Sequence, residues 1–358
     1  MALLISVSVF HALRTPGADP ASAKLAEWAR DHQLGFVVTG AESALYRLHP
    51  PKVGGAPDTS IINALPQQTA TQSNSASGSS PTHISFYPTR LRPLASGVVS
   101  GEGIFHTVTS HNGDPTSAIA YLRPDNQHSS YLAGVVWLNH THTALVQHPG
   151  HEDPGNVSSW SNRDFVSAAP GSNLIATFNG GFKIKDAKGG YYQDGKTAGT
   201  LQPGAASLVV YRDGHADVGS WDKDVRMSPA VVSVRQSLKP LIENGQVTSD
   251  LTKNVESKWG ATLGGAYFVW RSGIGITKRG DLVYVAGDAL SVKSLATLLL
   301  HAGAVRGMQL DINKAWISYM YFTDGGGSLQ PHKLVPFERP VNRYLTPTSR
   351  DFFAVYSK

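Results

Sequence analysis

The chain has 358 residues and no cysteine, which excludes disulfide bonds and thiolate metal sites. Its 36 glycines, 21 prolines and charged fraction of 16% favour a loop-rich protein with β-structure over a helical bundle. The formal charge of +5, without any Lys/Arg-rich run, fits anionic cell-surface polymers or phosphorylated substrates better than nucleic acid.

The first 18 residues contain an apolar stretch over residues 2–10. This stretch is too short to span a bilayer, and it lacks the positive n-region of a complete signal peptide. We interpret residues 1–18 as the remnant of an export signal or a membrane anchor. A short strand or a disordered tail is the alternative.

Residues 19–49 are predicted to be helical. Asp19 followed by Pro20 is typical of a helix start, and Gly35 of a helix end. One face of this helix carries Leu25, Trp28, Ala29 and His32. Residues 37–48 continue as a second helix in one interpretation.

Residues 50–81 have the composition of a disordered linker, with a tract rich in Ser, Thr, Gln and Asn over residues 67–80. Such a tract cannot bury enough apolar surface to fold alone. We therefore expect a tether between the N-terminus and a working domain, residues 82–358.

The working domain begins with a β-rich part. Runs of β-branched and aromatic residues between turn signals predict strands. These runs are 98–100, 105–109, 118–122, 132–138, 143–147, 174–178, 206–211, 231–234, 246–247 and 352–356. No internal repeat is found, and the sequence predicts an α+β (mixed α/β) protein with a mixed sheet.

The chain is organised around residues 259–320, which are predicted to form strand, strand, helix and strand. The strands are 266–270, 282–285 and 307–310. The helix is predicted between an N-cap at Ser291 and a left-handed stop at Gly303. Arg271 and Asp311 each follow a predicted strand, where binding groups are commonly placed.

Two short stretches suit the binding of an anion. Asn179, Gly180 and Gly181 follow a predicted strand, and the glycines let backbone N–H groups face a ligand oxygen; an ordinary turn is the alternative. Arg271 offers a planar fork of donors for phosphate, while Ser272 and Gly273 keep the adjacent backbone slim. The alternative for Arg271 is an ion pair with a structural acid such as Asp311.

A histidine-based metal site was also considered. His140 and His142 would share one face of a strand, with Glu152 and Asp153 close behind. Such residues are more often solvated or satisfied within a core, so we predict no metal and no cofactor. Walker-type, GxSxG and HExxH motifs are absent from the sequence.

Three segments together resemble the phosphodiester glycosidase family, the family of the lysosomal "uncovering enzyme", N-acetylglucosamine-1-phosphodiester alpha-N-acetylglucosaminidase. They are Phe178-Asn179-Gly180-Gly181-Phe182, Arg271-Ser272-Gly273-Ile274-Gly275-Ile276, and Ala302-Gly303-Ala304 leading to Leu310-Asp311. The resemblance covers residues 172–321. The flanking β-rich region looks like that of an actinobacterial exported variant.

This resemblance implies a mixed α/β catalytic domain that hydrolyses the bond between a sugar's anomeric carbon and a phosphate. By the same resemblance, Asn179, Gly180 and Gly181 would line the pocket. Arg271 would hold the phosphate, and Asp311 would act as acid/base or as an orienting carboxylate. Weaker candidates for that carboxylate are Asp288 and Glu256.

One stretch departs from the family pattern. The glycines that usually follow the Leu-Asp pair are replaced here by Ile312-Asn313-Lys314-Ala315-Trp316, and a glycine string appears only later, at 324–328. We interpret that later string as a turn at a strand end. Asn313, Lys314 and Trp316 would fill the space, with Lys314 as a second phosphate contact and Trp316 stacking on a sugar.

Three functions therefore remain open at this stage. The first is an exported hydrolase, extracellular or at the cell surface, that cleaves a glycosyl-phosphate bond in a glycan or glycoconjugate. The second is a non-catalytic cell-wall glycan-binding module that uses Trp316, Tyr319 and Tyr321. The third is a His-centred metallohydrolase.

Overall fold

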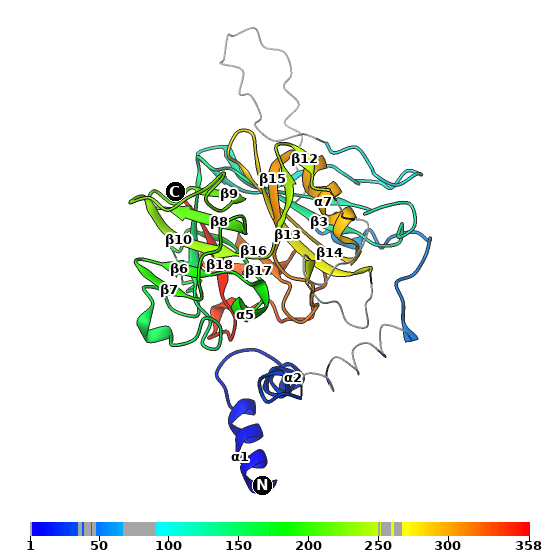
Figure 1. The fold of residues 1–358 in the computed structure, drawn as a ribbon. Coiled ribbons are helices and arrows are strands. Elements are labelled where there is room, and N and C mark those ends of the chain that lie inside the picture. Colours follow the sequence, from blue (N-terminus) through cyan, green and yellow to red (C-terminus); the bar gives the residue numbers. More distant parts are fainter. Residues whose placement is uncertain are drawn as a thin grey trace.

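The computed structural model describes residues 2–34, 38, 44, 48–66, 90–169, 171–249, 251, 259–260 and 267–358. In this part of the chain, three antiparallel sheets form the body (Figure 1). Two N-terminal helices, α1 (Ala2–Leu13) and α2 (Ala21–Asp31), lie on one side of it.

The large sheet has eight strands in the described residues. In spatial order they are β1 (His106–His111), β2 (Asp114–Leu122), β3 (Ala133–Leu138), β14 (Leu282–Leu290), β13 (Val269–Thr277), β15 (Ala304–Gln309), β11 (Pro240–Glu243) and β12 (Gln246–Val247). Helix α7 (Val292–His301) packs on this sheet through a buried stripe that includes Leu295, Leu298 and Leu299.

Two five-stranded sheets complete the body. The second sheet has the order β7 (Lys196–Ala198), β6 (Tyr191–Gln193), β10 (Val231–Gln236), β8 (Ala206–Tyr211) and β9 (Ala216–Ser220). The third sheet has the order β17 (Leu329–Lys333), β16 (Tyr319–Asp324), β5 (Leu174–Asn179), β18 (Phe352–Ser357) and β4 (Thr143–His148). Short helical turns connect these strands: α4 (Ser60–Asn63), η1 (Val157–Ser159), α5 (Ile184–Ala187) and η3 (Arg343–Leu345).

The three sheets share one apolar core. Ile274 of the large sheet, Leu208 of the second and Phe353 of the third belong to the same buried cluster. Phe178 lies near its centre, with its ring centroid 5.3 Å from those of both Phe353 and Tyr284. Because strands from all three sheets contribute, the ends of β5, β13 and β15 are held in fixed relation to one another.

The sequence predictions for α7 and the fold class are confirmed. Ser291 is the N-cap, with its Oγ accepting from Ser294 N at 2.9 Å, and Gly303 has a φ of +98°. The protein is α+β, as predicted. Every described strand ladder is antiparallel, however, so the expected mixed sheet is not seen.

The glycine-rich stretch after Arg271 lies inside a strand, whereas the sequence predicted that the strand ends at residue 270. β13 continues to Thr277, and Gly273 pairs with β14 on one side and β15 on the other. A Cβ on Gly273 would lie 2.8 Å from the carbonyl oxygen of Met308, and one on Gly275 would lie 2.6 Å from the Cβ of Ala304. These glycines therefore permit close packing inside the sheet.

The N-terminal region differs from its predictions in two places. Residues 2–13 are helical, which is neither of the alternatives of strand or disordered tail. Residues 51–66, the first half of the predicted linker, pack on the body, where Ile62 and Leu65 are each 3% exposed. The rest of the linker and most of the predicted second helix lie outside the described residues. None of the described helices is long and apolar enough to cross a bilayer.

Candidate active site

The first component of the site is the Asn-Gly-Gly corner at the end of β5. Asn179 donates from Nδ2 to Ser272 Oγ at 3.1 Å, and its Oδ1 accepts from Tyr284 OH at 2.9 Å and Ser318 N at 3.2 Å. The side chain thus joins the third sheet to β13 and β14 and fixes the corner. Gly180 lies against Asp351, whose Oδ2 would be 2.2 Å from an added Cβ, so only glycine fits there.

The second component is Asp311, which lies two residues after the end of β15. Its backbone N–H donates to Ser272 Oγ at 3.2 Å. The Ser272 hydroxyl therefore connects the backbone of Asp311 to the side chain of Asn179. Its Oδ1 accepts from the backbone N–H groups of Ile312 at 2.7 Å and Asn313 at 2.9 Å. Burial raises the pKa of Asp311, although the neighbouring arginine Arg350 acts in the opposite direction.

Arg271 points away from this carboxylate. Successive side chains of a strand face opposite sides, and Ser272 takes the side of Asp311. The buried Arg271 guanidinium donates from Nε to Leu290 O at 2.9 Å and from Nη1 to Gln309 Oε1 at 2.8 Å. Gly273 faces the same way as Arg271, toward Leu295 and Leu299 of α7. The structure does not place either residue at the corner.

Arg350, which the sequence analysis missed, supplies a guanidinium where Arg271 was expected. Its Nη2 lies 3.9 Å from Asp311 Oδ2, and its Nε lies 3.9 Å from Asp153 Oδ2. Its Cζ lies 4.9 Å from the centroid of the Trp316 ring. Arg350 lies two residues before β18, far from the three motifs in sequence, so no local pattern indicated it.

Arg235 and Asp351 form a second buried ion pair beside Arg350. Arg235 donates from Nε to Asp351 Oδ2 at 2.8 Å and from Nη2 to Asp351 Oδ1 at 3.0 Å. Both side chains are fully buried. This two-bond geometry is the one that arginine and carboxylate favour, and it holds the chain just before β18 in place. The positions of Gly180 and Arg350 therefore both depend on it.

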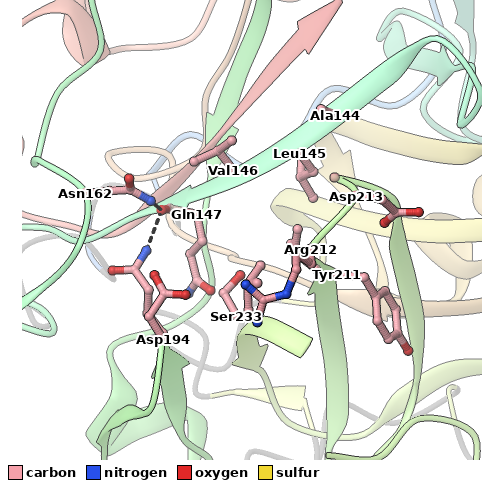
Figure 2. Close-up of a pocket in the computed structure, with 14 residues that line it drawn as sticks. Ala144, Leu145, Val146, Gln147, Asn162, Asp194, Tyr211, Arg212, Asp213 and Ser233 are labelled. Carbon is pink, nitrogen blue, oxygen red and sulfur yellow. Dashed lines mark hydrogen bonds between the residues drawn. The ribbon is translucent and has the colours of Figure 1, made fainter. Parts of the chain in front are cut away.

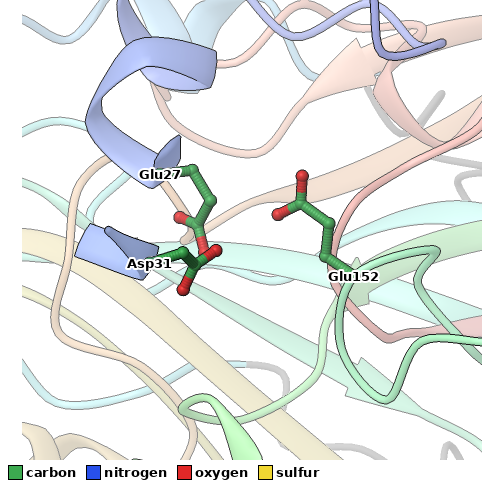
Figure 3. Close-up of side chains that lie close together, drawn as sticks. All are labelled: Glu27, Asp31 and Glu152. Carbon is green, nitrogen blue, oxygen red and sulfur yellow. The ribbon is translucent and has the colours of Figure 1, made fainter. Parts of the chain in front are cut away.

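Helix α2 closes the site from outside. The Glu27 carboxylate is 3% exposed; it contacts Lys183 Nζ and lies 3.8 Å from Arg350 Nη1. Asp31 accepts from the same ammonium at 3.0 Å. Figure 3 shows Glu27 and Asp31 pointing from α2 toward Glu152. Desolvation and the charge of Glu27 raise the pKa of Glu152 to about 7.

These three acidic residues have the spacing of a candidate metal site. One carboxylate oxygen from each lies within 4.8 Å of the others, and no other such group of His or acidic residues occurs in the described part of the chain. The ammonium of Lys183 already binds two of them, Glu27 and Asp31. We therefore interpret the group as an ion-pair cluster rather than a metal centre.

The residues that replace the family's glycines lie in different environments. Asn313 shapes the turn, with its Oδ1 accepting from Ala315 N at 2.9 Å. Lys314 is exposed and lies 3.9 Å from Glu338. Trp316 is 5% exposed. The Cζ atom of Arg339 lies 4.4 Å from the centroid of its ring, and the Arg350 guanidinium also lies over this ring. Among the side chains of Asn313, Lys314 and Trp316, only that of Trp316 therefore lies against the Arg350 guanidinium, whereas Asn313 contacts Asp311 through its backbone N–H.

The remaining candidates do not join the site. Asp288 is partly buried, and its Oδ1 accepts from the N–H of its own neighbour, Ala289. Glu256 lies outside the described residues. Tyr319 and Tyr321 are 0% and 7% exposed, so they cannot form the glycan-binding surface of the module hypothesis.

The histidine prediction is wrong in its geometry. His140 and His142 lie in the turn between β3 and β4 rather than on one face of a strand. His140 Nδ1 is 2.8 Å from Asp281 Oδ1, and His142 Nε2 is 3.6 Å from Asp114 Oδ2, so each imidazole has a separate acidic neighbour. Nothing in the described residues gathers these histidines around a common point.

The later glycine string is a turn, as interpreted from the sequence. It joins β16 to β17, and Asp324 Oδ1 accepts from the N–H groups of Gly326 at 3.0 Å and Gly327 at 3.1 Å. The position that follows the helix–glycine–strand unit is therefore the one occupied by Asp311.

Comparison with known proteins agrees with the sequence motifs. Residues 172–311, less than half of the chain, match the profile of the phosphodiester glycosidase family, which confirms the resemblance over that segment. No curated protein sequence matches the chain significantly.

Solved structures with a similar arrangement were also found. One is the catalytic domain of zebrafish N-acetylglucosamine-1-phosphodiester alpha-N-acetylglucosaminidase, auto-inhibited by its pro-peptide: 15% identity, TM-score 0.42, covering 71% of this chain and 87% of that one. Another is a hypothetical protein from Synechocystis: 12% identity, TM-score 0.38, covering 70% of this chain and 64% of that one.

Proposed function

We propose, on the premise that residues 172–311 carry a phosphodiester glycosidase domain, that this protein hydrolyses the bond between a sugar's anomeric carbon and a phosphate. The observation that carries the proposal is the meeting of an Asn-Gly-Gly corner, a buried carboxylate and a buried guanidinium. Asp311 and Arg350 approach to 3.9 Å there, beside Gly181 O at 3.5 Å from Arg350 Nη2.

The phosphate group is assigned to Arg350 and Lys183 rather than to Arg271. A phosphodiester carries a negative charge on oxygen atoms, as does the carboxylate of Glu27, which contacts both cations. A guanidinium fork and an ammonium suit such oxygens through charge-assisted hydrogen bonds. The Glu27 carboxylate therefore marks the position that a substrate phosphate would take.

Asp311 is assigned the proton-transfer role. Phosphate is a good leaving group, so the harder tasks are stabilising the oxocarbenium-like transition state and activating water. Burial raises the pKa of Asp311 and so makes its carboxylate a stronger base than an exposed aspartate. The two backbone N–H groups on Oδ1 orient the carboxylate and leave Oδ2 directed to the Arg350 side.

The walls of the site are assigned to residues that border this pair. Asn179, Gly180, Gly181 and Ser272 form the rigid side. Trp316 borders the other side, where its ring supports the Arg350 guanidinium and would present its edge to a sugar.

The N-terminal segment, residues 2–34, is proposed to inhibit this activity in the same chain. Among the described residues, the carboxylate partners of Lys183 are Glu27 and Asp31, both on α2. Arg339 Nη1 likewise takes its carboxylate partner at 2.7 Å from Asp19 of this segment. Substrate phosphate and Glu27 therefore compete for the same cations, and α2 must move before turnover.

The natural substrate is proposed to be a sugar phosphodiester within a cell-surface glycan or glycoconjugate, met outside the cytoplasm. The apolar stretch at residues 2–10 and the formal charge of +5 support this assignment. Both are compatible with an exported protein near an anionic polymer.

The test is a panel of sugar-1-phosphate diesters and cell-wall fragments, with release of free sugar as the readout. We expect turnover of at least one diester, rising when α2 is displaced. Binding without product, for the wild-type protein and for variants with α2 displaced, would contradict the hydrolase and support a binding module.

A further inference from the structure

Arg339, which the proposed hydrolysis does not use, meets a carboxylate of the N-terminal segment beside the candidate active site. Its side chain is 0% exposed, and its Nη1 lies 2.7 Å from Asp19 Oδ1. In the described part of the chain, the body brings no carboxylate of its own into an ion pair with Arg339. The cation therefore loses its partner whenever residues 2–34 move away, and a buried charge without a partner is unfavourable.

Arg339 belongs to the same site as Arg350, because both guanidinium groups lie against one indole ring. The Cζ atom of Arg339 is 4.4 Å and that of Arg350 is 4.9 Å from the centroid of Trp316, so the two Cζ atoms cannot be further apart than these two distances together. Arg343 adds a third guanidinium, 5.5 Å from the same centroid. Burial and the charge of Arg343 lower the pKa of Arg339 to about 10, which is the direction expected for a cation that lacks negative charge around it.

The N-terminal segment presents two carboxylates to these cations at once. Asp19 pairs with Arg339, and Glu27 Oε1 lies 3.8 Å from Arg350 Nη1. A gap of about 10 Å³ remains between the segment and the body, lined by both carboxylates and by Trp316. A gap of this size holds one water molecule at most. An anionic ligand therefore enters this place in exchange for the segment.

The chain around Asp19 is fitted to the body. Gly17 has a φ of +115°, and a Cβ added to it would lie 2.0 Å from the carbonyl oxygen of Pro347, so glycine is required for this close approach. Asp19 Oδ2 accepts from Ser349 Oγ at 3.4 Å. Asp19 thus has a defined position on Arg339, unlike the carboxylate of a mobile surface pair.

We infer that Arg339 is a second anion subsite beside the phosphate position, and that the substrate carries a further phosphate or carboxylate close to its phosphodiester. The inference rests on the proposed function, because it treats the docked segment as occupying the place of a substrate. Asp19 stands where the second anion would bind, as Glu27 stands where the first would bind. A guanidinium fork binds either kind of group through charge-assisted hydrogen bonds. The substrate class is therefore a glycan with neighbouring anionic groups.

The first experiment measures how anions displace the segment from the full chain, with limited proteolysis of α2 as the readout. The probes are alkanediol bisphosphates of three to six carbons, alkyl phosphates of the same lengths that end in a carboxylate, and plain alkyl monophosphates, all at constant ionic strength. Two linked contacts bind far more strongly than either alone. We expect at least one doubly charged probe to expose α2 at a concentration at least tenfold lower than the monophosphate of equal length. Absence of this advantage over the whole series would overturn the inference.

Arg339→Met tests whether this residue is the source of the advantage. The ratio between the effective concentrations of monophosphate and bisphosphate should fall to about one, whereas Arg339→Lys, which keeps a cation, should retain part of the ratio. Arg212→Met is the matched control, because Arg212 is exposed and lines a separate cavity between β4, β8 and β10 together with Asp213 (Figure 2). A wild-type ratio in folded Arg339→Met, or a loss of the ratio in Arg212→Met, would overturn the inference. If Arg339→Met does not fold, the comparison of probes on the wild-type protein still decides.

Turnover separates this inference from the proposed function. Two sugar phosphodiesters are compared that differ only by a second phosphate or carboxylate on the group beyond the phosphodiester. We expect kcat/KM to be at least tenfold higher for the doubly charged diester. Equal turnover of both diesters would overturn the inference and leave the hydrolase standing. Displacement of the segment by bisphosphates without hydrolysis of any diester would instead refute the hydrolase and leave the two anion subsites.

Discussion

Replacing Glu27 with glutamine should release the N-terminal segment and raise turnover. The substitution keeps the size and hydrogen-bonding capacity of the side chain but removes the charge that faces Lys183 and Arg350. Glu27 is 3% exposed, so this charge is poorly screened by solvent. The wild-type contact should therefore contribute more free energy to the docking of α2 than a surface ion pair would.

The size of the effect follows from that contact. Hydrogen bonds to charged groups contribute about 1.5–3 kcal/mol, and each 1.4 kcal/mol corresponds to roughly a factor of ten in an equilibrium constant. Loss of the charge should thus shift the docking equilibrium by roughly 10- to 100-fold toward the open state. As long as the closed state predominates, kcat/KM should rise by the same factor.

The assay combines steady-state turnover of a sugar phosphodiester with limited proteolysis of α2. Asp31→Asn is the matched control, because Asp31 lies on the same helix and binds the same lysine but is 41% exposed. Exposed pairs contribute about 0.2–1 kcal/mol, so its effect should stay below roughly fivefold. If Glu27→Gln makes α2 sensitive to protease without raising turnover, inhibition by this segment is refuted.

Three further predictions concern the site residues and pH. Asp311→Asn should lower kcat by about 10²–10⁴ with little change in melting temperature, because an asparagine oxygen still accepts the two backbone N–H groups. Arg350→Met should raise KM at least tenfold. Arg271→Met should instead lower the melting temperature and leave kcat of the folded protein intact, because Leu290 O and Gln309 lose their hydrogen-bond donor. The opposite pattern would restore Arg271 as the phosphate ligand. Burial, and secondarily the charge of Glu27, raises the pKa of Glu152 from 4.5 to about 7, so the contribution of Glu152 to docking of α2 is fully present below about pH 4.5 and is lost as pH rises through about 7. Proteolysis of α2 should increase over that range, and Glu152→Gln should remove the pH dependence.

The sequence predicted those parts of the site that lie next to strong local patterns. Asn179 and Asp311 each follow an apolar run, and the structure brings them together through Ser272. The helix between Ser291 and Gly303 was predicted because its cap, apolar stripe and glycine stop are all local signals. The family resemblance rests on the same segments, so it did not indicate Arg350 either.

The guanidinium was misplaced because its position depends on strand pairing. The sequence predicted a strand that ends just before Arg271, but β13 runs on to Thr277 between two partners. Once Ser272 faces Asp311, alternation along the strand turns Arg271 to the other side of the sheet. Periodicity indicates that two neighbours face opposite sides, but only the packed sheet determines which side becomes the site.

The sequence alone determined the α+β class, the helix after β14, the Asn-Gly-Gly corner and the carboxylate after β15, because each depends on residues close together in the chain. The tertiary structure decided the rest. Arg350, near the C-terminus, approaches Asp311, and Glu27 of the N-terminal helix α2 approaches Arg350. Contacts between distant segments follow from how three sheets and two N-terminal helices pack, and local propensity carries no information about that packing.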